Sequence, residues 1–144
     1  MRNPSSNVMP FDQNAEFFAR RALKKRQGGH YREAVSLLLR AVQAEPDQAE
    51  RLMELAEVYG EMGCPLESNR ILADLLARPN PDPASWFGLA CNLYAMGNTA
   101  GAQTAALRYI DAAPEGDYCE EASQLISALQ YAEHMTEPAE RRLL

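Results

Sequence analysis

Small residues and glycines recur along the chain at a constant interval of 34 residues. The triplets that show this interval are Ala22, Ala56 and Ala90, then Gly29, Gly63 and Gly97, then Ala34, Ser68 and Ala102. Small residues let two helices cross closely, and glycine permits the positive φ at which a helix can end and reverse. Large apolar residues that can fill the space between helices recur at the same interval, as Phe18, Leu52 and Trp86. The pattern therefore predicts pairs of antiparallel helices joined by glycine turns.

Seven helices follow from this pattern. The expected pairs span residues 12–27 and 31–45, 48–61 and 65–77, and 83–96 and 99–112. A seventh helix is expected over residues 117–134, because one face of that segment is apolar at helical spacing, at Tyr118, Ala122, Leu125, Leu129 and Ala132. It has no paired helix, so we expect it to cap the array. Residues 1–11 are interpreted as a flexible N-terminal segment and residues 136–144 as a polar tail.

The interval and the phase of these residues closely resemble the tetratricopeptide repeat (TPR) family. The resemblance covers three repeats, at residues 15–48, 49–82 and 83–116, within a domain of residues 12–135. It implies an all-α, right-handed superhelix of about seven antiparallel helices. Some positions depart from the family pattern. Arg21 and Lys25 stand where apolar residues are usual, and Pro65 and Ser68 make the second turn atypical.

Composition and charge narrow the class of protein. The 144 residues are 47% apolar and 24% charged, which is ordinary for a globular protein, and the formal net charge of −6 argues against binding nucleic acid. No apolar run approaches the ~20 residues of a membrane helix, and the first residues lack the apolar stretch of a secretory signal. Three cysteines without metal-type spacing favour reduced thiols. We therefore expect a cytoplasmic protein without a membrane partner.

The resemblance implies a concave groove lined by the first helix of each pair, which in this family usually binds a peptide. Helical angles identify the residues that lie on the face opposite the core. The candidate groove residues are Arg20, Leu23 and Arg26 in the first repeat, Glu50, Met53, Glu54, Glu57 and Glu61 in the second, and Phe87, Cys91 and Tyr94 in the third. The groove is thus expected to change from basic, through acidic, to aromatic.

The aromatic group gives the sharpest prediction. Phe87 and Tyr94 are large apolar residues on a face that the core does not need, and exposed aromatic residues on a concave surface are typical anchors for a partner. The alternative is that both rings pack against the seventh helix. Cys91 lies between them along the chain and is interpreted as a small residue that lines the groove.

The charged groups have two interpretations each. Like charges one helical turn apart cost stability, so the four glutamates of the second repeat suggest a partner with basic side chains, or else a solvated face. The basic run of residues 20–26 could form a site for an anionic ligand, but the preferred interpretation is a solvated face. Some members of the family clamp a C-terminal carboxylate, but only Arg20 matches the clamp positions here, so no such clamp is expected.

No motif for catalysis, a metal ion or a cofactor is found in the sequence. His30 and His134 lie far apart in the chain, and no serine or cysteine has the context of a nucleophile. We therefore expect no enzymatic activity, but a protein–protein interaction module that binds a partner peptide or helix in the groove. The alternatives are a bacterial secretion-type chaperone for an export substrate and an oligomerisation or regulatory segment of a larger protein. A homodimer also stays open.

Overall fold

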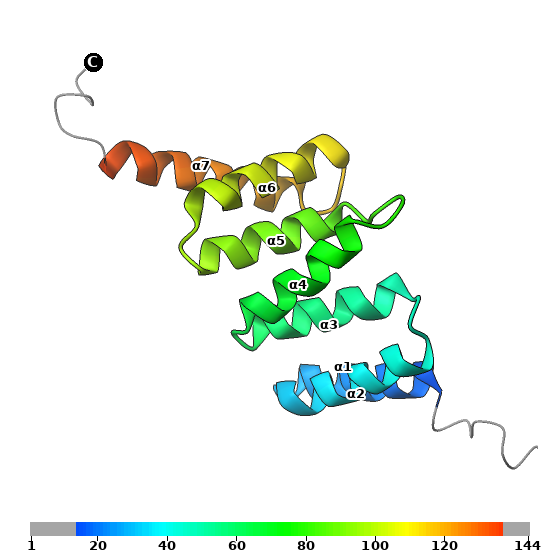
Figure 1. Ribbon diagram of the computed structural model, residues 1–144. Helices are drawn as coiled ribbons and strands as arrows, with labels where there is room; N and C mark the ends of the chain where they lie inside the picture. The colour runs from blue at the N-terminus through cyan, green and yellow to red at the C-terminus, as the bar shows by residue number, and fades with distance from the viewer. Residues whose placement is uncertain (1–13, 137–144) are drawn as a thin grey trace, which may run out of the picture. The chain divides into compact units, whose positions relative to one another are not determined.

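The structure, a computed structural model, describes residues 14–136, and the regular elements in that range are all helices (Figure 1). The helices are α1 Ala15–Gln27, α2 Tyr31–Ala44, α3 Ala49–Glu61, α4 Pro65–Leu76, α5 Ala84–Ala95, α6 Thr99–Ala112 and α7 Cys119–Thr136. The predicted all-α class and the order of the helices are confirmed. The expected N-terminal segment and, after Thr136, the expected tail lie outside the described residues.

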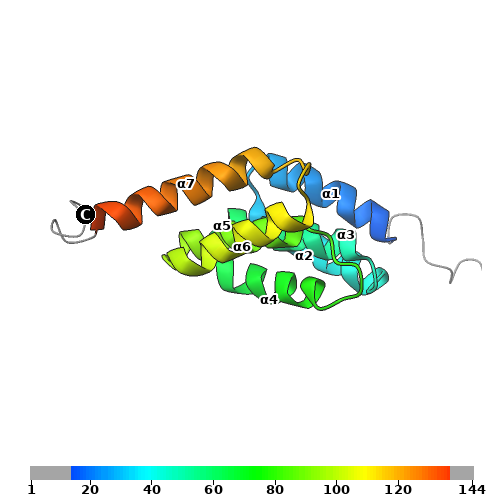
Figure 2. The same ribbon diagram turned by 90° about the horizontal axis from the view of Figure 1, so that it is seen from above.

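The chain divides into two compact units. The first ends at Leu75 and holds α1 to α3 with nearly all of α4, and the second begins at Leu76 and holds α5 to α7. Within the second unit, α5 and α6 lie side by side in both views (Figures 1 and 2). Each unit has its own buried cluster of apolar side chains.

The three glycine turns share one conformation. Gly29, Gly63 and Gly97 have φ values of 79°, 83° and 81°. In the first turn the amide of His30 donates to the carbonyl of Lys25 at 2.8 Å, and the amide of Gly29 donates to the carbonyl of Arg26 at 3.0 Å. The same two bonds recur after α3 and α5 and form a Schellman motif, so the predicted turns are confirmed.

The small residues of the repeat lie where the helices cross. Each of the six is almost fully buried: Ala22, Ala34, Ala56, Ser68, Ala90 and Ala102. Ser68 keeps the close crossing of α3 and α4, because its hydroxyl donates to the carbonyl of Ala56 at 2.7 Å. Pro65 is the first residue of α4, a position where a helix needs no amide donor. The second turn therefore keeps the geometry of the other two.

Arg21 and Lys25, the two residues of α1 that depart from the family pattern, make contacts with neighbouring side chains. The guanidinium carbon of Arg21 lies 5.5 Å from the centre of the Phe17 ring. Lys25 pairs with Glu33 of α2 at 2.7 Å, and this hydrogen bond lowers the pKa of the Glu33 carboxyl below its ordinary value. Both basic residues thus have partners at positions where the family usually places apolar side chains.

The core of the second unit joins all three of its helices. The buried members of this cluster are Ala90 of α5, Ala105, Ala106 and Tyr109 of α6, and Ala122 of α7. Trp86, Leu125 and Ile126 are partly buried against it. Ala122 and Leu125 of the stripe predicted for the seventh helix thus belong to this cluster and Leu129 is also buried, whereas Ala132, further along α7, is exposed.

Candidate functional site

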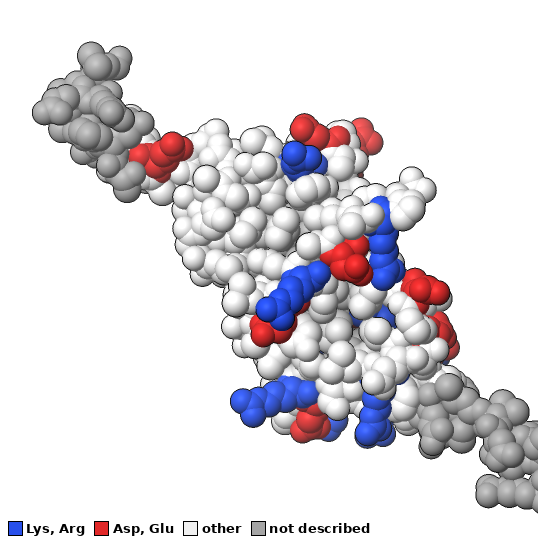
Figure 3. Space-filling model, viewed as in Figure 1, with Lys and Arg blue, Asp and Glu red and all other residues white. Residues whose placement is uncertain are grey.

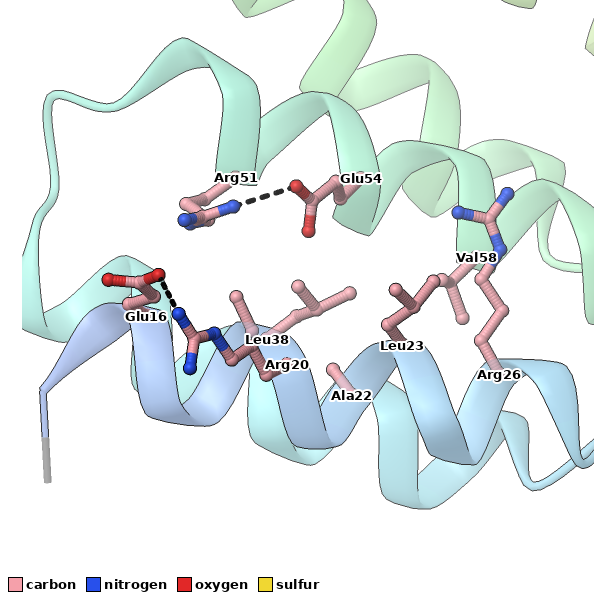
Figure 4. Close-up of a pocket in the computed structure, with 10 residues that line it drawn as sticks. Glu16, Arg20, Ala22, Leu23, Arg26, Leu38, Arg51, Glu54 and Val58 are labelled. Carbon is pink, nitrogen blue, oxygen red and sulfur yellow. Dashed lines mark hydrogen bonds and ion pairs between the residues drawn. The ribbon is translucent and has the colours of Figure 1, made fainter. Parts of the chain in front are cut away.

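A cleft of about 300 Å³ opens between α1 and α3 in the first unit (Figure 4). Its floor consists of buried apolar side chains, namely Ala19 and Ala22 of α1, Leu38 of α2 and Val58 of α3. Leu23 of α1 also lines the cleft and is 52% exposed. The cleft is therefore an apolar concavity that is open to solvent.

Charged side chains surround this apolar floor in pairs. On α1, Nη2 of Arg20 lies 2.5 Å from Oε1 of Glu16, and on α3, Nη1 of Arg51 lies 2.8 Å from Oε1 of Glu54. Figure 4 shows these two pairs on opposite sides of the cleft. Arg51 also lies 3.8 Å from Glu50. Each acidic side chain at this end of the cleft thus has an arginine beside it.

Arg26 links the two helices at the other end of the cleft. Its Nε donates to Oε1 of Glu61 at 2.8 Å, and its Nη2 contacts the same Glu61 oxygen. Nη2 also donates to Oε2 of Glu57 at 3.1 Å. The hydrogen bond to Glu61 raises the pKa of Arg26 above its ordinary value, with a smaller contribution from Glu57. Only 25% of the Arg26 side chain is exposed. This arginine is therefore a fixed cation between two carboxylates.

Mixed charge is also visible on the wider surface. On the face shown in Figure 3, basic and acidic side chains lie next to one another rather than in separate patches of one sign. The acidic excess in the sequence therefore does not form a continuous acidic patch on that face.

Three aromatic rings are packed together in the second unit. The ring of Phe87 stacks on that of Tyr118, with centroids 4.7 Å apart and planes 3° apart, and it lies 5.7 Å from the ring of Tyr109. The Tyr118 amide donates to the Tyr109 hydroxyl at 3.0 Å. The interpretation that placed Phe87 on a face separate from the core is wrong, because the residue that precedes α7 covers its ring.

Tyr94 and Cys91 differ from Phe87 in their exposure. Tyr94 is 49% exposed, and Cys91 is an exposed residue of the same helix. Partial burial of the Cys91 thiol nevertheless raises its pKa above the ordinary value. Whether these two residues contact a partner stays a prediction.

Between residues 14 and 136, no group of three or more His, Cys, Asp and Glu side chains is placed to hold a metal ion. None of the described helices combines the length and the apolar character needed to cross a membrane.

Comparison with known proteins gives one curated relative and several solved structures of similar fold. The TPR repeat-containing protein YvcD of Bacillus subtilis is 32% identical over 125 residues, which are 86% of this chain and 26% of YvcD. The chain thus spans about a quarter of the length of this relative. The first TPR of Spaghetti (RPAP3), bound to an HSP90 peptide, superposes with a TM-score of 0.73 at 15% identity, covering 87% of this chain and 97% of that one.

The chain is a tetratricopeptide-repeat domain. A second solved structure of similar fold is the type III secretion chaperone SycD of Yersinia enterocolitica in complex with a peptide of the translocator YopD. It has a TM-score of 0.73 and 16% identity, and covers 82% of this chain and 93% of that one. No protein-family model matches the chain. The resemblance inferred from the 34-residue interval is confirmed by these likenesses and by the seven helices found between residues 14 and 136.

The cleft brings together only part of the predicted TPR groove. Four of the predicted residues line it: Arg20, Leu23, Arg26 and Glu54. Met53 is half-buried on α3, and the remaining glutamates carry the ion pairs with Arg26 and Arg51. Phe87, Cys91 and Tyr94 belong to the second unit. The predicted groove residues therefore fall into two groups, one in each unit.

Sequence reasoning missed Arg51, Leu38 and Val58. Arg51 was not among the groove residues that the helical angles selected, but its side chain lines the cleft. Leu38 and Val58 are core residues whose surfaces also form the floor of the cleft. The ion pairs that join the glutamates of α3 to Arg26 and Arg51 were missed as well. A signal for one of them was present, because Arg26 and Glu61 occupy neighbouring positions of the repeat, at the same end of α1 and α3.

A second cleft, of about 470 Å³, lies between α6 and α7. Its lining combines Leu107 and small and polar residues of α6 with Leu129, Ala132 and Glu133 of α7. None of the predicted groove residues lines it.

Proposed function

We propose that this TPR domain is a protein-interaction module that binds a segment of a partner protein in the cleft between α1 and α3. The observation that supports the proposal is the half-exposed side chain of Leu23, which lies beside the buried apolar floor of an open cleft. Burial of such surface by a partner is favourable, by roughly 25 cal/mol per Å² of apolar area. A volume of about 300 Å³ is small for a ligand pocket, and it suits one or two side chains better than a cofactor.

Structures of similar fold give precedents for a peptide ligand. The RPAP3 TPR is bound to an HSP90 peptide, and SycD is in complex with a YopD peptide. We do not extend HSP90-peptide binding to this chain, because Ala19 and Leu23 stand where a carboxylate clamp would need polar side chains. The partner that we propose supplies apolar side chains. Tyr94 and Met53 are further candidates to contact it, whereas Phe87 contributes through its packing against Tyr109 and Tyr118.

Affinity capture followed by mass spectrometry tests this proposal. Leu23→Ser should reduce the recovery of partners that the wild-type chain retains, because it removes the exposed apolar side chain of the cleft. Leu39→Ser is a matched control, since Leu39 is 42% exposed on α2 and does not line the cleft. Equal losses for both variants, or no loss for Leu23→Ser, would argue against binding in the cleft.

A second variant tests the predicted anchor in the other unit. Tyr94→Ala is preferred to Phe87→Ala, because Tyr94 is exposed and its removal leaves the ring stack in place. If the same partner uses both groups of residues, Tyr94→Ala should also lower its recovery. An unchanged recovery would remove Tyr94 from the proposed site.

A bacterial secretion-type chaperone is the second candidate function, and the likeness to SycD favours it. In this case the partner is an export substrate that precipitates without the chaperone, so co-expression should keep it in solution. If the chain is instead an oligomerisation or regulatory segment of a larger protein, light scattering should show self-association at micromolar concentration. We place the protein in the cytoplasm and assign it no catalytic or nucleic-acid-binding role in this proposal.

A further inference from the structure

Glu57 and Glu61 are one helical turn apart on α3 and face α1. Two carboxylates at this spacing would attract a basic side chain of a partner, but Arg26 already contacts both of them. Its side chain is three-quarters covered, so it is held in place rather than extended into solvent. The acidic pair therefore has an internal cation.

We infer that Arg26 sets the charge preference of the cleft, so that the cleft accepts an apolar side chain flanked by uncharged residues and gives no advantage to lysine or arginine. This inference rests on the proposed function and specifies the chemistry of the partner. It replaces the basic partner expected from the sequence for the glutamates of α3.

The other ion pairs around the cleft also favour a partner segment with uncharged flanking residues. Arg51 lies beside Glu50 and Glu54, and Arg20 lies beside Glu16. A basic side chain brought to any of these carboxylates meets an arginine of the domain as well, and like-charge contacts select against a partner. An acidic side chain meets a glutamate in the same way. An uncharged flank avoids both costs.

The floor of the cleft defines the central part of the partner segment. Ala22 and Val58 are apolar and almost fully buried, and the neighbouring Leu23 supplies an exposed aliphatic surface. A leucine of the partner would cover this surface and be surrounded by alkyl groups. The proposed ligand is therefore a short segment with a leucine-type side chain between uncharged residues.

NMR titration with three end-blocked peptides tests the inference. The peptides are acetyl-GSLLSG-amide, acetyl-GKLLKG-amide and acetyl-GDLLDG-amide, which differ only in the residues beside the leucines. Dissociation constants are measured from the amide signals of Ala22 and Val58. In the wild-type domain the lysine peptide should bind no more tightly than the neutral peptide.

Arg26→Gln should uncover the two carboxylates. The affinity of the lysine peptide relative to the neutral peptide should then rise about fivefold, the effect of one surface ion pair. Lys24→Gln is the matched control, because it removes the same charge from the same turn of α1 at a residue that does not line the cleft. It should leave the ratio unchanged.

Glu57→Gln combined with Glu61→Gln provides an independent variant. Arg26 loses both internal partners in this variant, so the aspartate peptide should gain affinity relative to the neutral one. An unchanged preference in both variants, with peptides still shifting the Ala22 and Val58 signals, would overturn the inference and leave the proposed function standing. If no peptide shifts these signals in the wild type or the variants, both proposals fail.

Discussion

Tyr109 is the residue on which the connection between α6 and α7 depends. It is buried, its hydroxyl accepts a hydrogen bond from the Tyr118 amide, and its ring lies beside Phe87. Gly116 of the same connection passes so close that a Cβ atom built on it would lie 2.2 Å from the Tyr109 hydroxyl and 2.9 Å from Cβ of Ala113. No other residue type fits at this position without movement of the ring or the loop.

Gly116→Ala should therefore destabilise the domain, by about 1–3 kcal/mol, the usual cost of overpacking. Urea denaturation gives this value. The same substitution in a Tyr109→Phe background should cost less, because the hydroxyl that the new methyl group would strike is gone. A double-mutant cycle with no coupling between the two substitutions would contradict this cause.

At the residue scale, the sequence predicted local features better than long-range ones. The turn glycines were predicted because a positive φ is a property of a single residue and recurs with the repeat. The covering of Phe87 was not, because Tyr118 comes from a distant segment that the helical angles of α5 do not include. The pairing of Arg26 with Glu61 was missed for the same reason, since it joins two helices.

At the scale of the elements, the crossing of α1 and α2 depends on small side chains. Ala34 has no exposed surface, so Ala34→Leu should force the two helices apart and cost about 1–3 kcal/mol. Ser36→Leu is the matched control, because Ser36 is exposed on the same helix. It should change stability by less than about 0.5 kcal/mol. Thermal unfolding of both variants measures the difference, and equal melting temperatures would argue against a close crossing at Ala34.

Trp86 tests the packing of α5. It is half-buried against the core of the second unit, and the guanidinium carbon of Arg108 lies 5.2 Å from the centre of its ring. Trp86→Ala should cost about 2–4 kcal/mol, somewhat less than for a fully buried aromatic residue. Arg108→Ala removes only the cation–π contact and should cost about 0.5–1 kcal/mol. A melting temperature that Trp86→Ala leaves unchanged would show that α5 packs in another register.

The first six helices were predictable because each one repeats a pattern found elsewhere in the chain, whereas α7 was predicted from its own apolar spacing. Turns and crossings recur at one interval, so the helix ends were constrained several times over. The cleft was predictable only in part. Arg20, Arg26 and Glu54 belong to the face that the helical angles selected, but Leu38 and Val58, which form part of the floor, are core residues that those angles did not select.

At the scale of the whole molecule, the two compact units should respond separately to local damage. In repeat proteins each element contacts mainly its neighbours, so the loss of stability is greatest near the substitution. Amide hydrogen exchange of the Gly116→Ala variant should therefore accelerate most in α6 and α7. Equal acceleration in α1 and α2 would indicate that the chain opens as one cooperative unit.

The three turns, with their identical hydrogen bonds, also determine how the chain can change in length. A turn depends only on residues within about one helical turn of its glycine, so any whole repeat that brings its own glycine can be added or removed without altering the others. Insertions of other lengths inside a helix would rotate the small residues away from the crossings. This protein can thus be lengthened in steps of one whole repeat, because each added repeat leaves the existing turns unchanged.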